Sequence, residues 1–119
     1  MRPELAPVVR DVTVASPVRV VVEEKPGGVT WLSVVGSTGT IGVVVPDDGT
    51  TAERIVAVTD QVEEWVVESL PGLGHPAVWP ECPEHPGSHP LEPAVHEGRA
   101  VWRCHRTLRV HAQVGALPA

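Results

Sequence analysis

The stretch that decides the fold is TTAERIVAVTDQVEEWVVESL, residues 50–70. Its apolar side chains recur every three or four residues, which is the period of one helix face; they are Ile55, Val58, Val62, Trp65, Val66 and Leu70. Thr50 and Glu53 have the spacing of a capping box, in which the hydroxyl and the carboxylate each accept a bond from an unpaired backbone N–H. Pro71 and Gly72 follow and end the helix. The pattern predicts an amphipathic helix at about residues 51–70.

The segment before this helix is rich in valine, which supplies 24 of the 119 residues. Valine is stiff at χ1 and packs well on a pleated sheet, so this bias favours strands. Apolar runs separated by turns at 24–28 and 36–39 predict strands at residues 18–23, 29–35 and 40–45, and a weaker one around 8–14. Because short connections make neighbouring strands antiparallel, we expect a Val-rich β-meander over residues 8–46, packed by the helix.

The segment after the helix is dominated by proline. Residues 71–93 hold seven of the thirteen prolines, so we expect a loop there. A C-terminal β-hairpin at about 99–104 and 107–113 follows. The predicted fold class is therefore α+β, with the β-meander and helix in residues 1–74 and a zinc-ribbon-like appendage in residues 75–119. We expect the two parts to form one compact unit.

The proline-rich segment contains residues that bind metals. Cys82 and His85 are spaced C-x2-H, the interval of a tight turn that brings two ligands to one tetrahedral ion. His89 follows, and Cys104 ends the next predicted strand. These four residues predict one closed, structural Zn²⁺ site, which would order a loop that has little apolar content of its own. His105 and His96 are alternative fourth ligands, and nearby carboxylates such as Glu84 are expected to orient the imidazoles. A Cys82–Cys104 disulfide and unrelated free thiols are the competing interpretations.

The motif CPEH at residues 82–85 resembles one knuckle of a zinc ribbon, C-P-x-C-G, with His85 in place of the second cysteine. A second C-x2-C knuckle is absent from the sequence, because Cys104 stands alone. The wider pattern, CPxHPxxHPL followed by AVWxC, is similar to a signature of small uncharacterised proteins of high-GC bacteria. That resemblance covers residues 79–104 best and implies no activity.

Charge is distributed unevenly along the chain. Fifteen carboxylates against nine Lys and Arg give a formal charge of −6, which argues against nucleic-acid binding by net charge. Residues 99–119 nevertheless carry four arginines and no carboxylate side chain: Arg99, Arg103, Arg106 and Arg109. On the predicted helix, the outer face is acidic through Asp60, Glu64 and Glu68. Without a membrane-spanning run or a signal-peptide pattern, a cytoplasmic location is expected.

Three classes of function fit these features. The favoured one is a small zinc-stabilised protein-binding protein, an adaptor or an inhibitor of the immunity type, whose acidic helix face contacts a basic partner. The first alternative is nucleic-acid binding by a zinc-ribbon-like protein through the C-terminal arginines. The second is a small metal-dependent hydrolase, but neither H-E-x-x-H nor the deaminase pattern is present. We therefore expect a protein partner, no membrane and no catalytic residues.

Overall fold

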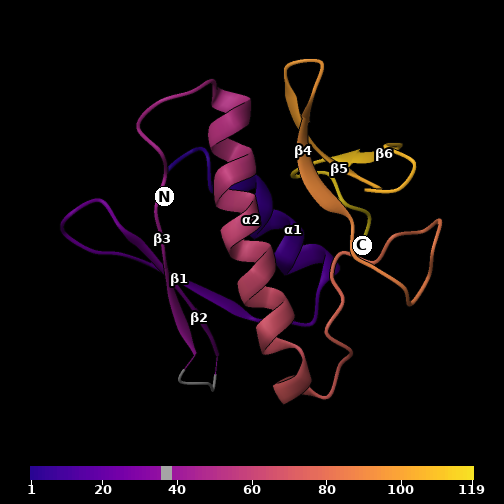
Figure 1. The fold of residues 1–119 in the computed structure, drawn as a ribbon. Coiled ribbons are helices and arrows are strands. Elements are labelled where there is room, and N and C mark those ends of the chain that lie inside the picture. The colour runs from indigo at the N-terminus through magenta and orange to yellow at the C-terminus, as the bar shows by residue number, and fades with distance from the viewer. Residues whose placement is uncertain (36–38) are drawn as a thin grey trace.

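The computed structural model describes residues 1–35 and 39–119 of the chain. Within these residues, two three-stranded antiparallel sheets combine with helices, and the predicted α+β class is confirmed (Figure 1). The first sheet has the order β1-β2-β3, made of Val20–Glu24, Thr30–Val34 and Thr40–Val43. The second has the order β4-β5-β6, made of Glu92–His96, Arg99–Arg103 and Val110–Gln113. The turn predicted at 36–39 falls on residues 36–38, which lie outside the described residues.

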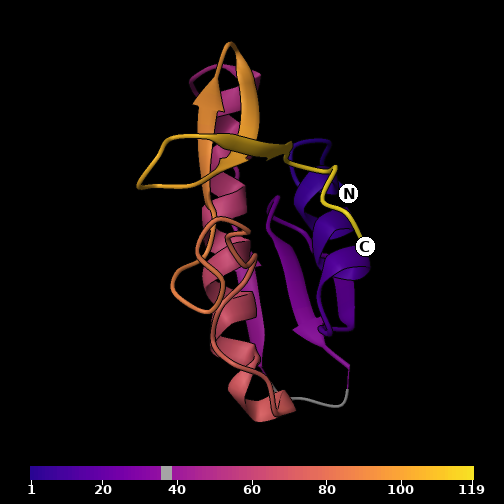
Figure 2. The same ribbon diagram turned by 90° about the vertical axis from the view of Figure 1, so that its right-hand side faces the viewer.

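Helix α2 (Thr51–Ser69) runs between the two sheets and contacts both of them (Figures 1 and 2). It begins with the predicted capping box: Glu53 N–H donates to Thr50 Oγ1 at 3.1 Å, and Thr50 N–H donates to Glu53 Oε1 at 2.9 Å. The predicted apolar stripe faces the core, where Val58, Val62 and Trp65 are buried. A short 3-10 helix, η1 (Pro71–Leu73), follows the end of α2. The helix prediction is therefore confirmed.

The weaker strand predicted around residues 8–14 is wrong, because this segment forms helix α1 (Ala6–Ala15). Leu5, Val8 and Val12 are buried, and their spacing of three and four residues is helical. Pro7 lies in the first turn, where its missing N–H costs nothing. The β-meander is therefore limited to β1–β3, and α1 packs against α2 and β1.

The C-terminal sheet has one strand more than the predicted hairpin. β4 pairs with β5 through a two-residue turn in which Glu97 and Gly98 have φ of 50° and 76°, the left-handed pair of a tight hairpin turn. β4 includes Pro93, which the expected loop placed outside any strand. β4 is an edge of its sheet, and an edge strand tolerates a proline because one side of it needs no ladder bonds.

A buried carboxylate joins the two ends of the chain. Asp11 of α1 is fully buried, and its Oδ2 accepts hydrogen bonds from Trp102 Nε1 at 2.9 Å and from Gly115 N–H at 2.6 Å. Its Oδ1 accepts from Leu117 N–H at 3.1 Å and from the Arg10 guanidinium at 2.9 Å. The C-terminal segment therefore lies along α1, as Figure 2 shows.

Another carboxylate, Glu63 on α2, lies in a less favourable environment. Its Oε2 is buried, and no described residue donates a hydrogen bond to it. Burial raises the pKa of Glu63 to about 8, and the charges of Asp60 and Glu92 add to this effect. Asp60 and Glu64 line the same cavity as Glu63, and Glu92 is paired with Arg103. Glu63 is consequently protonated in the folded protein at neutral pH.

We expect the raised pKa of Glu63 to make the folded state less stable as the pH rises. The stabilisation is complete below the ordinary carboxyl pKa of 4.5 and is lost as the pH rises through about 8. Between about pH 5.5 and 7.5 the loss should reach about 2–3 kcal/mol, because one pKa unit corresponds to about 1.4 kcal/mol. Urea unfolding of the wild type and of Glu63→Gln at several pH values measures this loss. The free energy of unfolding should fall less steeply with pH in Glu63→Gln than in the wild type. Equal pH dependence in both proteins would refute the raised pKa of Glu63.

Candidate metal centre

The proline-rich segment folds back on itself and forms a closed loop. Leu91 N–H donates to the Pro80 carbonyl at 2.7 Å, and Cys82 N–H donates to the His89 carbonyl at 3.3 Å. Inside the loop, His85 N–H donates to the Cys82 carbonyl at 3.1 Å, which makes the tight turn that the C-x2-H spacing predicts. Backbone bonds at both ends of the loop therefore hold Cys82, His85 and His89 close together.

Cys104 reaches the same place from the end of β5. Its N–H donates to the Arg109 carbonyl at 3.0 Å, and its carbonyl accepts from Leu108 N–H at 2.8 Å. These two bonds close the connection between β5 and β6 and fix the cysteine at its base. Leu108 has φ of 61°, a left-handed conformation that turns the chain back toward β6.

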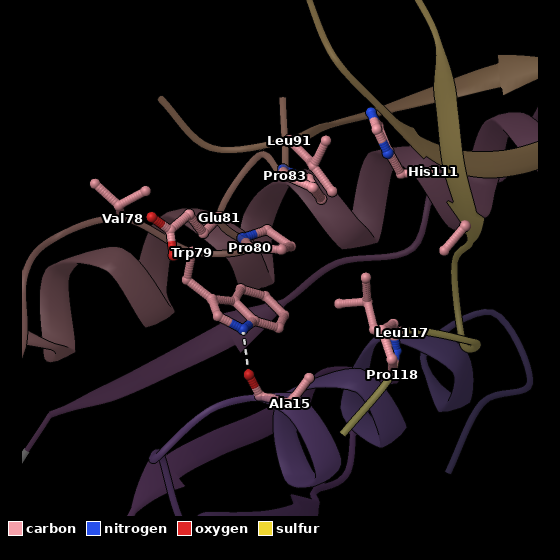
Figure 3. Close-up of a pocket in the computed structure, with 11 residues that line it drawn as sticks. Ala15, Val78, Trp79, Pro80, Glu81, Pro83, Leu91, His111, Leu117 and Pro118 are labelled. Atoms are coloured by element: carbon pink, nitrogen blue, oxygen red, sulfur yellow. Dashed lines mark hydrogen bonds between the residues drawn. The ribbon is translucent and has the colours of Figure 1, made fainter. Parts of the chain in front are cut away.

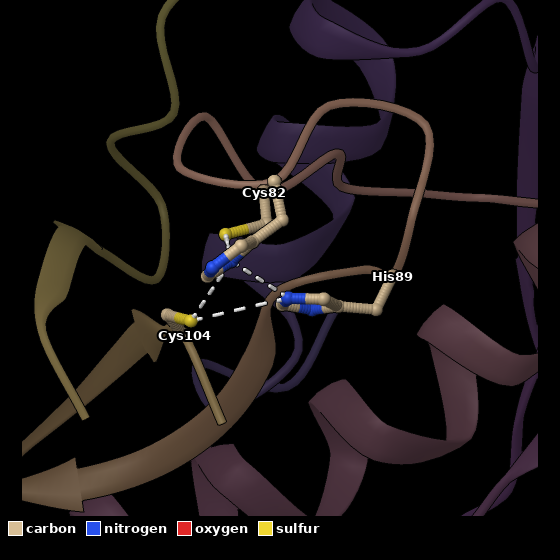
Figure 4. A group of neighbouring side chains, drawn as sticks. Cys82, His89 and Cys104 are labelled. Carbon is tan, nitrogen blue, oxygen red and sulfur yellow. Dashed lines mark hydrogen bonds between the residues drawn. The ribbon is translucent and has the colours of Figure 1, made fainter. Parts of the chain in front are cut away.

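The four predicted ligands come together in one cluster (Figure 4). One donor atom from each of Cys82, His85, His89 and Cys104 lies within 4.8 Å of every other. His85 Nδ1 is 3.7 Å from Cys82 Sγ, 3.6 Å from Cys104 Sγ and 3.0 Å from His89 Nε2. Cys104 Sγ is 4.0 Å from His89 Nε2. The chain therefore has a candidate Cys2His2 metal-binding cluster.

These separations fit a tetrahedral ion. With bonds of about 2.3 Å to sulfur and 2.0–2.1 Å to nitrogen, donor atoms at the corners of a zinc tetrahedron lie about 3.3–3.8 Å apart. The four separations given above, 3.0–4.0 Å, bracket that range, so small side-chain movements bring all four donors to bonding distance. The donor set of two sulfurs and two imidazoles is one that structural zinc sites use.

The His89 ring is held in an orientation that suits metal binding. Its Nδ1 lies 2.9 Å from the Pro90 carbonyl, which can only accept, so Nδ1 carries the proton of that bond. The neutral ring then has a lone pair on Nε2, the atom that points into the cluster. Metal-binding histidines commonly use a backbone carbonyl in this way to fix the tautomer.

Both cysteines are free thiols and are fully buried, so the two do not form the competing disulfide in this structure. Burial raises the pKa of the Cys104 thiol, but hydrogen bonds from Thr107, Arg106 and Cys82 outweigh burial and hold this pKa below its ordinary value. The thiolate is the form that binds a metal. The backbone around Cys104 therefore favours the metal-binding form.

The alternative fourth ligands do not join the cluster. His105 packs edge-on against the His89 ring, with centroids 4.3 Å apart, and is exposed. His96 lies at the end of β4, where its Nε2 is 3.8 Å from a carboxylate oxygen of Glu97. Among the described residues, the cluster holds neither of them. His105 is thus a neighbour of the cluster and His96 belongs to the β4–β5 turn.

The expectation that nearby carboxylates orient the ligand imidazoles is wrong for the described contacts. Glu84 accepts from His111 Nε2 at 2.5 Å and from the Thr107 hydroxyl at 3.0 Å, and Arg109 lies 3.7 Å away. The His111 bond holds the pKa of Glu84 below its ordinary value, despite the opposing effect of burial. Glu81 accepts from Gly87 N–H at 2.6 Å, within the loop itself. Sequence reasoning missed this role of His111, because 27 residues separate it from Glu84.

Two tryptophans pack beside the cluster. Trp102 is fully buried, and its ring meets the Trp79 ring edge-on with centroids 5.6 Å apart. Trp79 Nε1 donates to the Ala15 carbonyl at 3.0 Å. Both rings belong to the same core as Cys82 and Cys104. They lie in the interior and are not a surface for stacking bases.

The predicted binding residues on the surface differ in their environment. Arg103 pairs with Glu92 at 2.9 Å, and Arg109 pairs with Glu84 at 3.7 Å. Within the described part of the chain, Arg99 and Arg106 form no ion pair. On α2, the three predicted acidic residues are exposed: Asp60, Glu64 and Glu68. Two of the four C-terminal arginines therefore form intramolecular ion pairs, and none of the three acidic residues on this face of α2 does so among the described residues.

A cavity of about 350 Å³ lies next to the metal-binding loop. Apolar side chains from α1, the loop and the C-terminal segment line it, and His111 contributes a polar group from β6 (Figure 3). Trp79 forms one wall and is fixed by its bond to Ala15. His111 therefore lines this cavity and also contacts Glu84.

Comparison of the chain with known protein families, curated proteins and solved structures gives no match. The zinc-ribbon-like character predicted for residues 75–119 is not confirmed, and side chains from this segment share one core with those of α1 and α2. In the described residues, every helix is too short or too polar to cross a bilayer.

Proposed function

We propose that this protein binds one zinc ion through Cys82, His85, His89 and Cys104, and that the ion is structural. The observation that carries the proposal is the convergence of four donor atoms, with separations close to those of a zinc tetrahedron. Four protein ligands leave no position for a substrate, which is typical of structural rather than catalytic zinc. Two thiolates balance the charge of the ion, so the centre is neutral in a buried setting.

The biological role that we propose is protein binding, with the metal fixing the loop and the second sheet against α2. The exposed face formed by Asp60, Glu64 and Glu68 supports this role, because the three like charges cost helix stability and lack intramolecular basic partners among the described residues. Complementary charge mainly sets the specificity and the rate of association. We therefore propose a basic protein as the partner, bound in an adaptor or inhibitor role.

Elemental analysis of the protein purified without chelator tests the metal site. We expect about one zinc per chain, because the four donors form a single closed site. Cys82→Ser and Cys104→Ser should each remove the bound zinc, since oxygen is a poorer zinc ligand than thiolate sulfur. His96→Ala and His105→Ala are matched controls that should keep it. The proposal would be contradicted if the wild-type protein contained no zinc, or if both serine variants retained it.

The partner proposal has its own test. An arginine-rich peptide should bind the wild type at low salt and dissociate as the salt concentration rises. The variant Asp60→Asn/Glu64→Gln/Glu68→Gln should bind it at least about tenfold more weakly, equivalent to about 1.4 kcal/mol. The control Asp47→Asn/Asp48→Asn/Glu97→Gln removes three exposed carboxylates from other regions. Equal loss of binding in both triple variants would show that only net charge matters and would refute a specific acidic face.

A further inference from the structure

A second group of metal-binding side chains shares a residue with the first. Donor atoms of Cys82, Glu84 and His111 also lie within 4.8 Å of one another. The three come from the loop and from β6, and the side chains of Glu84 and His111 are only 16% and 18% exposed. Cys82 is fully buried. The group is therefore largely protected from solvent, unlike chance pairs of acidic residues on a surface.

The carboxylate of this group is already oriented by its neighbours. The Thr107 hydroxyl shares its single proton between the two carboxylate oxygens of Glu84, which lie 3.1 and 3.0 Å from Oγ1, and Arg109 lies 3.7 Å from Oε1. These contacts leave Oε2 beside His111 Nε2, at 2.5 Å. Partners that hold ligand side chains in place are typical of metal sites. A metal bound here would take the place of the direct contact between His111 and Glu84.

The donor types fit zinc with an open coordination position. Cysteine, histidine and glutamate are all zinc ligands, and three protein ligands leave the fourth position to water or to a bound molecule. His111 also lines the cavity of about 350 Å³, so small molecules can approach this group more readily than the closed cluster (Figure 3). A thiolate sulfur has lone pairs for two ions, which allows Cys82 to serve both groups.

The charges indicate that the second ion binds more weakly. In the closed cluster, the two thiolates of Cys82 and Cys104 already balance the charge of its own zinc. The negative charge of Cys82 is therefore largely neutralised before a second ion binds. The Glu84 carboxylate supplies the negative charge that belongs to the second ion alone. The positive charge of Arg109 lies close to the carboxylate and opposes the ion.

We propose that Cys82, Glu84 and His111 form a second, weaker divalent-metal site, with the Cys82 thiolate bridging it to the zinc of the closed cluster. The proposal rests on the proposed function through Cys82, which belongs to both groups. It adds a site with an open coordination position to a chain whose first site is closed. Zinc, or cobalt as its spectroscopic substitute, is the expected ion.

Titration of the purified holoprotein with zinc, followed by elemental analysis of equilibrium-dialysed samples, measures the second site. We expect a second equivalent in the wild type at zinc concentrations that leave the first site saturated. His111→Ala and Glu84→Gln should each lose the second equivalent and keep the first. His96→Ala removes an exposed histidine next to a carboxylate and should keep both. Glu84→Gln preserves the shape of the side chain, so loss of the second zinc equivalent in this variant cannot be assigned to misfolding.

Cobalt substitution tests the shared thiolate. A second cobalt ion should increase the thiolate-to-cobalt charge-transfer absorption, and this increase should vanish in His111→Ala. A wild type that saturates at one equivalent, or a second equivalent that survives in both His111→Ala and Glu84→Gln, would overturn the proposal. Failure of the first site has a different signature, because zinc would then be absent from the protein as purified and Cys104→Ser would have no effect.

Discussion

Removal of the zinc with a chelator is expected to unfold the loop of residues 80–91 and the β5–β6 connection. Structural zinc sites in small peptides contribute an apparent binding free energy of about 10–16 kcal/mol at pH 7. A whole domain is stable by only about 5–15 kcal/mol. The loop and the residue before it bury few apolar side chains, mainly Trp79 and Leu91. With the proposed ion bound, the order of the loop is expected to depend on it far more than that of α2 does.

Hydrogen exchange followed by mass spectrometry measures this effect. After chelation, amide protection should fall by at least about a hundredfold in residues 80–91 and 104–110, equivalent to about 2.7 kcal/mol. Peptides from α2 and from β1–β3 should change least, because their apolar residues pack without help from the loop. Cys104→Ser should already exchange fast and should not respond to the chelator. Unchanged protection in the wild-type loop would show that no bound metal orders it.

Asp11→Ala should destabilise the protein by about 3–5 kcal/mol, the usual cost of breaking a buried network that contains a charge. The carboxylate accepts hydrogen bonds from Trp102 Nε1 and from the N–H groups of Gly115 and Leu117. Alanine would leave these three donors without their partner in the interior, and each buried unpaired donor costs about 1–3 kcal/mol. Burial of Asp11 is complete, so water cannot replace the lost acceptor without local opening.

Urea unfolding gives the size of this change, and two further variants separate its causes. Asp60→Ala, on the exposed face of α2, should change the stability by less than about 0.5 kcal/mol. Asp11→Asn keeps one acceptor oxygen but turns an NH2 group toward the donors. Its free energy of unfolding should therefore lie between those of the wild type and Asp11→Ala. An Asp11→Ala protein as stable as Asp60→Ala would mean that the C-terminal segment does not depend on this carboxylate.

Helix α2 could be predicted from the sequence because its signals are local. The capping box spans Thr50 to Glu53, and the apolar stripe from Ile55 to Leu70 repeats over about four turns. Helix α1 was missed because its valines favour strands and because one member of its buried face is Asp11, which breaks the apolar pattern. That side chain is buried because of donors located 91–106 residues away. Sequence periodicity alone does not contain this information.

The metal cluster shows the same division between local and distant signals. Cys82, His85 and His89 could be found because a single short loop holds them, and Cys104 because it is the only other cysteine. The pairing of Glu84 with His111 was not predicted, since it depends on how β6 returns beside the loop. β4 was missed because Pro93 indicates a loop, although an edge strand accommodates it.

The bonds of Asp11 also constrain how the chain folds during synthesis. Trp102, Gly115 and Leu117 follow Asp11 by 91 to 106 residues, so they are synthesised well after it. Until then α1 carries a carboxylate on its core-facing side without three of the donors that satisfy it in the interior, and this side stays hydrated. Contacts so distant in sequence slow folding, because the whole intervening chain must be ordered before they form. Helix α1 should therefore dock only after residues 102–117 have been synthesised.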